Sequence, residues 1–194
     1  MTDSLITKKI IAKSLKELMA RQPFQKISVR DIMERAGLRR QTFYYHFQDK
    51  FELLTWIYQS ETREHSIDFF NYDEPERIFT HLLYYVYDNR EFYEKAIQVH
   101  EQNGFFQALS VHIESLYDRL ISEWAKRDGF TLSDERREFI IRYYSKGFIG
   151  FVETWLAEGC RTDARELSGE LNDVVHKGLR NCLNSRAEDG GDRE

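Results

Sequence analysis

The sequence has 194 residues, of which 41% are hydrophobic and 31% charged, with only 2 Pro and 10 Gly. This composition supports a hydrophobic core and favours helices over many short strands. The net charge of −5 hides an asymmetry, because residues 1–50 carry 11 Lys and Arg against 5 Asp and Glu, a net of +6, and the remainder carries 17 against 28, a net of −11.

The N-terminal part is predicted to form two helices joined to a tight turn. Apolar residues at helical spacing predict the first helix over about residues 7–21. Ser28 is placed as an N-cap, and Asp31 stands three residues later in a variant of the capping box, so a second helix should begin at Val29. Gly37 then suits the left-handed residue that ends such a helix.

Further helices are predicted along the rest of the chain. A third short helix should cover about residues 39–47, and Asp49 should cap a fourth that begins at Lys50 and continues beyond Ser60. Longer helices are expected over about residues 76–88, 91–102, 104–127, 133–158 and 163–185. The sequence therefore predicts an all-α fold, with a small, basic helical domain over residues 1–50, a larger helical domain over 51–185 and a disordered tail over 186–194.

Two short helices joined by a Gly-containing turn are the geometry of a helix-turn-helix, whose second helix enters the major groove of DNA. Phe43 and Phe47 are four residues apart and should point into the small core with Leu38. The side chains expected to lie outside this core are those of Arg39, Arg40, Gln41, Thr42, Tyr45 and His46. Arg and Gln can read guanine and adenine edges, whereas Tyr, His, Thr and Lys suit phosphates. A small helical subdomain with a merely solvated charged face is the alternative.

An extended motif over about residues 8–56 closely resembles the N-terminal signature of the tetracycline-repressor (TetR) family of bacterial regulators. The matching residues are Ile27-Ser28-Val29-Arg30-Asp31-Ile32, Ala36-Gly37-Leu38, Thr42-Phe43-Tyr44-Tyr45-His46-Phe47, Asp49-Lys50 and Leu53-Leu54. The resemblance implies a three-helix DNA-binding head, a linking fourth helix and a larger helical C-terminal domain. Within the family, Arg39-Arg40-Gln41-Thr42-Phe43-Tyr44 and Ile10-Ile11-Ala12 resemble regulators linked to dihydroxyacetone kinase genes.

The resemblance also implies roles for individual residues of the head. Phosphate contacts fall on Thr42, Tyr44, His46 and Lys50, and base readers fall on Arg40, Gln41 and Tyr45. Ser28 and Arg39 complete the set of candidate DNA-binding residues. Arg39 stands where many family members have Ser or Thr, so a side-chain cap worth up to about 1–2 kcal/mol is expected to be missing there.

The C-terminal region is predicted to hold a dimer interface and an effector site. The family pairs its last two helices with those of a second copy, and the candidate interface residues are Gly147, Gly150, Leu167, Leu171, Val174, Val175 and Leu179. Aromatic residues of the middle helices that could line an effector pocket are Phe79, Tyr84, Phe105, Tyr117, Tyr143 and Tyr144. Both sets have a plainer interpretation as intrachain core.

The chain is therefore expected to be a homodimeric regulator that binds a palindromic double-stranded DNA operator and is controlled by a small-molecule effector or a co-regulator protein. No signal peptide, membrane span, enzyme motif or cofactor is predicted, and the location should be cytoplasmic. The remaining alternatives are a metal-responsive regulator and a helical ligand-binding dimer without DNA binding. The thiolate and imidazole donors that a metal sensor would use are His100, His112, Cys160, His176 and Cys182, which form no close ligand pair.

Overall fold

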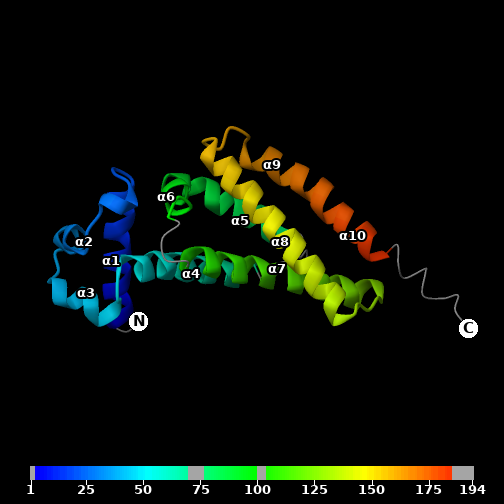
Figure 1. Ribbon diagram of the computed structural model, residues 1–194, viewed down its shortest axis with the longest axis horizontal. Coiled ribbons are helices and arrows are strands. Elements are labelled where there is room, and N and C mark those ends of the chain that lie inside the picture. Colours follow the sequence, from blue (N-terminus) through cyan, green and yellow to red (C-terminus); the bar gives the residue numbers. More distant parts are fainter. Residues whose placement is uncertain (1–2, 70–76, 100–103, 185–194) are drawn as a thin grey trace, which may run out of the picture. The chain divides into compact units, whose positions relative to one another are not determined.

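The computed structural model describes residues 3–69, 77–99 and 104–184. Its helices are α1 (Asp3–Met19), α2 (Val29–Ala36), α3 (Arg40–His46), α4 (Lys50–Phe69), α5 (Arg77–Asp88), α6 (Arg90–Ala96), α7 (Gly104–Asp128), α8 (Asp134–Ala157), α9 (Ala164–Leu171) and α10 (Lys177–Asn184) (Figure 1). A 3₁₀ turn, Phe24–Lys26, precedes α2, and a π-helical turn, Asn172–His176, joins α9 to α10. No strand occurs among the described residues, and the predicted all-α fold is confirmed.

Most helix boundaries lie within a few residues of their predicted positions, because the local capping signals are present. Ser133 accepts a hydrogen bond from the backbone N–H of Arg136 at the start of α8. Asp163 caps α9 in the same way through the N–H of Arg165. The helix predicted over 163–185 is present as an unbroken run of helical residues from α9 to α10, in which the π-helical turn, Asn172–His176, is the one local departure from α-helical hydrogen bonding.

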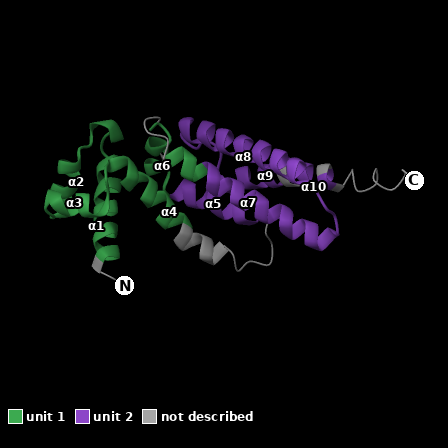
Figure 2. Cartoon of the chain, turned by 60° about the horizontal axis from the view of Figure 1, so that its bottom comes forward, with its two compact units in different colours: residues 1–66, 89–109 green, residues 67–88, 110–194 purple. Residues whose placement is uncertain are grey.

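The chain divides into two compact units, which Figure 2 shows in green and purple. Unit 1 comprises residues 1–66 and 89–109, and unit 2 comprises residues 67–88 and 110–194. The predicted domain boundary at residue 50 stays a prediction, and the predicted tail over 186–194 lies outside the described residues.

Unit 1 packs the first four helices around an apolar core to which α6 contributes. The core side chains, each at most 2% exposed, include Ile11, Leu15, Met19, Ile32, Met33, Phe43, Phe47, Leu53, Leu54 and Ile57. Polar contacts also connect α1 to later helices, because Lys16 Nζ lies 2.7 Å from Glu61 Oε1 and 3.2 Å from Asn89 Oδ1. Lys95 on α6 donates a hydrogen bond to the carbonyl of Met19 at the end of α1.

Unit 2 is built from α5, most of α7, and α8 to α10. Its buried side chains include Ile78, Phe79, Leu82, Leu83, Ile113, Tyr117, Leu120, Ile121, Trp124, Phe148, Trp155, Leu167 and Leu179. Trp155 closes the connection between α8 and α9, because its indole N–H donates to the carbonyl of Thr162 at 2.9 Å. No helix in the described part of the chain is both long and apolar enough to cross a membrane.

Candidate DNA-binding site

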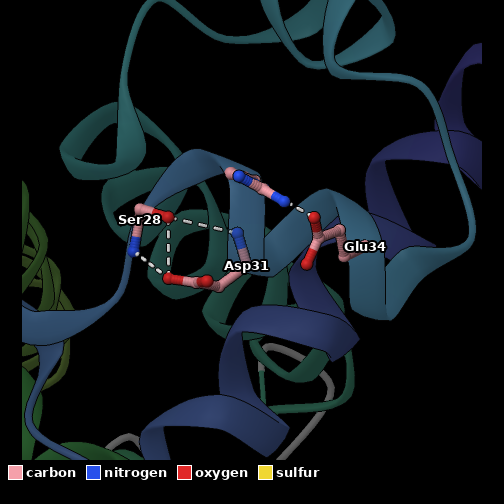
Figure 3. A network of polar contacts seen from close by, with 4 residues as sticks. Ser28, Asp31 and Glu34 are labelled. Carbon is pink, nitrogen blue, oxygen red and sulfur yellow. Dashed lines mark hydrogen bonds and ion pairs between the residues drawn. The ribbon is translucent and has the colours of Figure 1, made fainter.

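The start of α2 is fixed by the predicted capping box, which Figure 3 shows from close by. The backbone N–H of Asp31 donates to Ser28 Oγ at 3.2 Å, and the backbone N–H of Ser28 donates to Asp31 Oδ2 at 2.8 Å. The Ser28 hydroxyl also donates to the same carboxylate oxygen at 2.7 Å. These hydrogen bonds from Ser28 lower the pKa of Asp31, so the carboxylate stays charged at the N-terminal end of α2. Ser28 therefore has a clear capping role, and its predicted DNA contact remains a proposal.

The turn between α2 and α3 depends on Gly37. Its φ of 67° lies in the left-handed region that glycine adopts without steric cost, as the sequence predicted. The amides of Gly37 and Leu38 donate to the carbonyls of Glu34 and Met33, at 3.2 and 3.0 Å, and so satisfy the end of α2. This tight turn joins α2 to α3, and the two helices contact each other, as in a helix-turn-helix.

Helix α3 is anchored by one buried face and exposes the other. Phe43 is fully buried and Phe47 is 2% exposed, and their ring centroids lie 5.7 Å apart. Arg39, Arg40, Gln41, Tyr44 and Tyr45 are exposed, while Thr42 and His46 are half-buried. Tyr45 is 84% exposed, which is unusual for a large aromatic ring without a partner surface. The exposed face thus gathers donors for both base edges and phosphates.

The first turn of α3 begins without a side-chain cap. Arg39 occupies the N-cap position with extended backbone angles, and its side chain makes no capping hydrogen bond. The expected missing cap is therefore confirmed. The backbone N–H of Thr42 donates instead to the carbonyl of Arg39 at 3.0 Å, and Arg39 adds a positive charge at the start of the helix.

Arg40 and Tyr44 form a pair on the exposed face of α3. Arg40 Nη2 donates to Tyr44 Oη at 2.9 Å, and the guanidinium carbon lies 5.5 Å from the centre of the Tyr44 ring. Residues four apart on a helix face the same side, so the pair extends the guanidinium along the outer surface. This arrangement limits the conformations of Arg40 before any contact with DNA is made.

His46 lies at the end of α3, next to a lysine from α1. Burial lowers the pKa of His46, and the charge of Lys8 lowers it further. Lys8 Nζ lies 5.2 Å from the ring centre of Phe47 and 5.6 Å from that of Trp56. The imidazole of the free protein is therefore neutral at pH 7 and can donate one N–H to a phosphate.

Lys50, the first residue of α4, is engaged within the protein. Its ammonium donates to the backbone carbonyls of Phe24, Gln25 and Ile27, at 3.0, 3.2 and 2.8 Å. Sequence reasoning did not foresee these contacts, since they join residues 23 to 26 positions apart. The neighbouring Asp49 caps α4 as predicted, because Asp49 Oδ1 accepts from the amides of Phe51 and Glu52 at 2.8 Å each.

The six candidate effector-pocket residues do not form one group. Phe79 and Tyr117 lie together in unit 2, with ring centroids 4.4 Å apart, and Tyr144 lies 6.0 Å from Tyr117. Phe105 belongs to unit 1, where its ring packs 5.5 Å from that of Tyr58. Tyr84 is half-buried, and Tyr143 is 66% exposed.

The candidate dimer residues also divide by burial. Leu167 and Leu179 are buried inside unit 2, Leu171 is half-buried, and Val174 is 70% exposed. Gly147 and Gly150 are exposed, and the side chain of Val175 lies outside the described residues. Three aromatic residues of α8, Phe139, Tyr143 and Phe151, are exposed and were not predicted as interface residues. Tyr143 was predicted to line the effector pocket instead. The spacing of these residues, 4 and 8 positions, is a signal in the sequence for a shared exposed face.

The residues considered for a metal site are not brought together in the part of the chain that the structure describes. No group of three or more His, Cys, Asp or Glu suitable for a metal is found among those residues. His112 is half-buried and Cys160 is buried, whereas His100 and the side chains of His176 and Cys182 lie outside the described residues.

Two family models match the chain. Residues 11–55 match the model described as bacterial regulatory proteins, tetR family, and residues 73–177 match that of a transcriptional regulator C-terminal region. The chain is also 40% identical over 159 residues, 82% of its length and 84% of the relative's, to the HTH-type dhaKLM operon transcriptional activator DhaS of Lactococcus lactis subsp. lactis (strain IL1403).

Solved structures show the same fold. The dihydroxyacetone kinase operon activator DhaS superposes with a TM-score of 0.74 at 31% identity, covering 91% of this chain and 97% of that one. The fatty acid degradation regulator FadR from Bacillus halodurans gives a TM-score of 0.68 at 16% identity, covering 90% and 96%. NalD, the secondary repressor of the MexAB-OprM multidrug efflux pump in Pseudomonas aeruginosa, gives 0.60 at 19% identity, covering 91% and 97%. The last two likenesses concern the fold alone.

Proposed function

The chain belongs to the TetR family of DNA-binding transcriptional regulators and is not an enzyme, and from this we propose that it binds a palindromic operator as a homodimer. The observation that carries the proposal is the exposed face of α3, which is anchored by Phe43 and presents Arg40, Gln41 and Tyr45 to a partner. In a helix-turn-helix this face lies in the major groove. Because its target is DNA, we place its action in the cytoplasm.

The proposed division of labour follows side-chain chemistry. Arg40 and Gln41 have planar, bidentate hydrogen-bonding groups and are exposed, so they read base edges together with Tyr45. Thr42, Tyr44, His46 and Lys50 contact phosphates, and the positive charge of Arg39 attracts the DNA backbone, while Ser28 adds a contact at the start of α2. The net charge of +6 over residues 1–50 attracts the polyanion and makes binding depend on salt.

A second copy of the chain is the proposed partner of the α8 face. Phe139 and Tyr143 are 60% and 66% exposed, and their rings are stacked 6.3 Å apart with planes at 14°. An exposed aromatic stripe of this kind marks an interaction surface. A Cβ added to Gly147 or Gly150 would meet no atom within 4 Å, so this stretch of α8 leaves room for the close approach of another helix. With Val174, these residues supply an interface that pairs two heads about 34–36 Å apart on DNA.

Regulation is proposed to act through unit 2. Phe79, Tyr117 and Tyr144 form a cluster of aromatic rings in this unit. Phe148 belongs to the same cluster, because its ring lies 5.1 Å from that of Phe79. The hydroxyl oxygens of Tyr117 and Ser145 are buried without a hydrogen-bond partner in the described structure. Burial raises the pKa of Tyr117, so this phenol stays protonated and can donate. A small molecule with polar groups would satisfy these hydroxyls, and a co-regulator protein on unit 2 is the alternative input.

The regulated genes are proposed to be those for dihydroxyacetone kinase. The relative with 40% identity is described as an activator of the dhaKLM operon, and the solved structure with 31% identity as an activator of the dihydroxyacetone kinase operon. The exposed residues of α3 determine which operator sequence is bound. If they bind the same sequence as the corresponding residues of these relatives, this chain regulates the same class of operon. Binding to promoters of such genes, compared with unrelated promoters, tests this assignment.

The central experiment is fluorescence anisotropy with labelled duplexes taken from the DNA flanking the gene and from a random-sequence selection, across a salt series. We expect steeply salt-dependent binding to one palindromic sequence with two chains per site. The control is a triple variant, Arg39→Ala with Arg40→Ala and Gln41→Ala, which removes exposed groups and leaves Phe43 and Phe47 in the core. Wild-type protein that selects no sequence from the random pool would refute sequence-specific binding.

A further inference from the structure

Lys8 of α1 is held beside the end of α3. Helices α1 and α3 contact each other within unit 1 (Figure 1). The Lys8 ammonium lies 5.2 Å from the ring centre of Phe47, which ends α3, and 5.6 Å from that of Trp56 on α4. These two rings meet edge to face at 5.7 Å, and the ring of His46 follows at 6.4 Å from that of Phe47. Lys8 is half-buried, so its charged end is held on this row of rings.

The Lys8 ammonium has no carboxylate partner in the part of the chain that the structure describes, where its contacts are the two ring faces. Two other lysines of α1 are paired, because Lys13 Nζ lies 4.0 Å from Glu17 Oε1 and Lys16 Nζ lies 2.7 Å from Glu61 Oε1. A contact with a ring face is electrostatic and has no acceptor atom. The N–H donors of Lys8 are therefore available to an anion.

The charge of Lys8 also acts on His46, the last residue of α3. Burial lowers the pKa of His46, and the charge of Lys8 lowers it further, so a protonated imidazole and the ammonium would repel each other. The acidic groups at the start of α4 are engaged elsewhere, since Asp49 and Glu52 accept hydrogen bonds from backbone amides within residues 48–52. An anion that contacts both the ammonium and the imidazole removes this repulsion and gains two charge-assisted hydrogen bonds.

We propose that Lys8 and His46 bind one DNA phosphate together, so that α1 contributes a backbone contact to the DNA-binding head. The inference rests on the proposed DNA-binding function and goes beyond it, since it adds a residue that precedes the helix-turn-helix. A phosphate contact carries no direct sequence information, so Lys8 raises the affinity for all duplexes alike. By holding the end of α3 against the backbone, it also fixes how the recognition helix enters the groove.

The first test compares Lys8→Met with Lys13→Met, which removes an exposed lysine from the same helix. Anisotropy of the full-length protein is measured with the operator selected from the random pool and with a random duplex, across a salt series. Loss of one phosphate contact predicts a slope of log affinity against log salt that is smaller by about 0.9 per head, which is about 8-fold in affinity per head at 0.1 M salt. Lys8→Arg should keep the wild-type slope. Equal slopes for Lys8→Met and Lys13→Met would overturn the proposal.

Neutral methylphosphonate groups, placed one at a time in the operator, locate the phosphate. One position should weaken binding of the wild-type protein and have a much smaller effect on both Lys8→Met and His46→Gln, because the contact is already lost in these variants. Different positions for the two variants, or no such position, would overturn the shared contact.

An NMR titration of His46 in the free protein supplies a readout that does not need DNA. Removal of the Lys8 charge should raise the pKa of His46, and an unchanged pKa would overturn the arrangement of the two groups. Lys8→Gln serves in all three measurements if Lys8→Met does not fold. Wild-type protein that binds no duplex would refute the proposed function itself, whereas wild-type binding with an unchanged slope in Lys8→Met refutes the Lys8 contact alone.

Discussion

Replacing Arg40 with Ala should alter which base pair is preferred at one position of each half-site. Arg40 is exposed at the start of α3, where helix-turn-helix proteins contact base edges. A bidentate contact with guanine is worth about 1–3 kcal/mol of discrimination, which corresponds to about 5- to 150-fold in affinity at that position. Folding stability should change by less than about 0.5 kcal/mol, because the side chain is exposed and packs in no core.

Replacing Tyr44 with Phe should have a smaller effect on DNA affinity, through the contact between Tyr44 and Arg40. Tyr44→Phe removes the hydroxyl that accepts from Arg40 at 2.9 Å but keeps the ring 5.5 Å from the guanidinium. The hydrogen bond lies in solvent, so its loss should cost about 0.5–1 kcal/mol of binding at most. In a double-mutant cycle with Arg40→Ala, a coupling of about 0.5 kcal/mol or more would show that Tyr44 positions the guanidinium.

The assay is anisotropy titration with the selected operator and a set of duplexes, each changed at one symmetric pair of positions. Arg40→Ala should lose its preference at one pair and keep it at the others. Arg21→Ala, which removes an exposed arginine outside α2 and α3, controls for the loss of charge. An equal loss of affinity on every duplex would show that Arg40 contacts the backbone and would refute the assignment of base reading.

Three further changes test the cap, the titration and the dimer. Ser28→Ala should cost about 1 kcal/mol by removing the capping box, and a midpoint of thermal unfolding lowered by less than about 2 °C would contradict this. The pKa of His46 is lowered by burial and by Lys8, whereas a nearby phosphate would raise it, so binding takes up a proton. Operator affinity should therefore rise as the pH falls from about 7.5 to 6, and a wild-type slope matching that of His46→Gln argues against the contact. Tyr143→Glu, which places a charge on an exposed ring position of α8, should yield monomers in sedimentation, and a dimer of unchanged affinity excludes this face.

Much of the head could be predicted from sequence, because its signals act over a few residues. The capping box of Ser28 and Asp31, the left-handed Gly37 and the spacing of Phe43 and Phe47 each specify a local geometry, and all of them are present. Such features depend on hydrogen bonds and sterics within one or two turns of the chain. The placement of α2 and α3 follows from them without knowledge of the rest of the fold.

The features that the sequence did not reveal depend on contacts between distant residues. Periodicity indicates that Phe79 and Phe105 are buried, yet it cannot tell that they belong to different units. Tyr143 is apolar enough for a core and is nevertheless exposed on α8, because the opposite side of that helix is the buried one. Lys50 is predicted to contact a phosphate, and its hydrogen bonds to three backbone carbonyls of the connection between α1 and α2 could not be read from the sequence, because they join residues far apart in the chain.

The helices that belong to unit 1 suggest a route by which the binding of an effector could affect the DNA-binding face of α3. The unit extends beyond the N-terminal helices to residues 89–109, and Tyr58 on α4 is buried against the rings of Tyr93 and Phe105 at 6.5 and 5.5 Å. Lys95 caps the end of α1 from the same segment. A ligand or partner that alters α6 or the first turns of α7 would therefore change the packing behind α1 and α4 directly. Because α1 packs against α2 and α3, such a change biases the presentation of the recognition helix within a single head, in addition to any change in the separation of two heads.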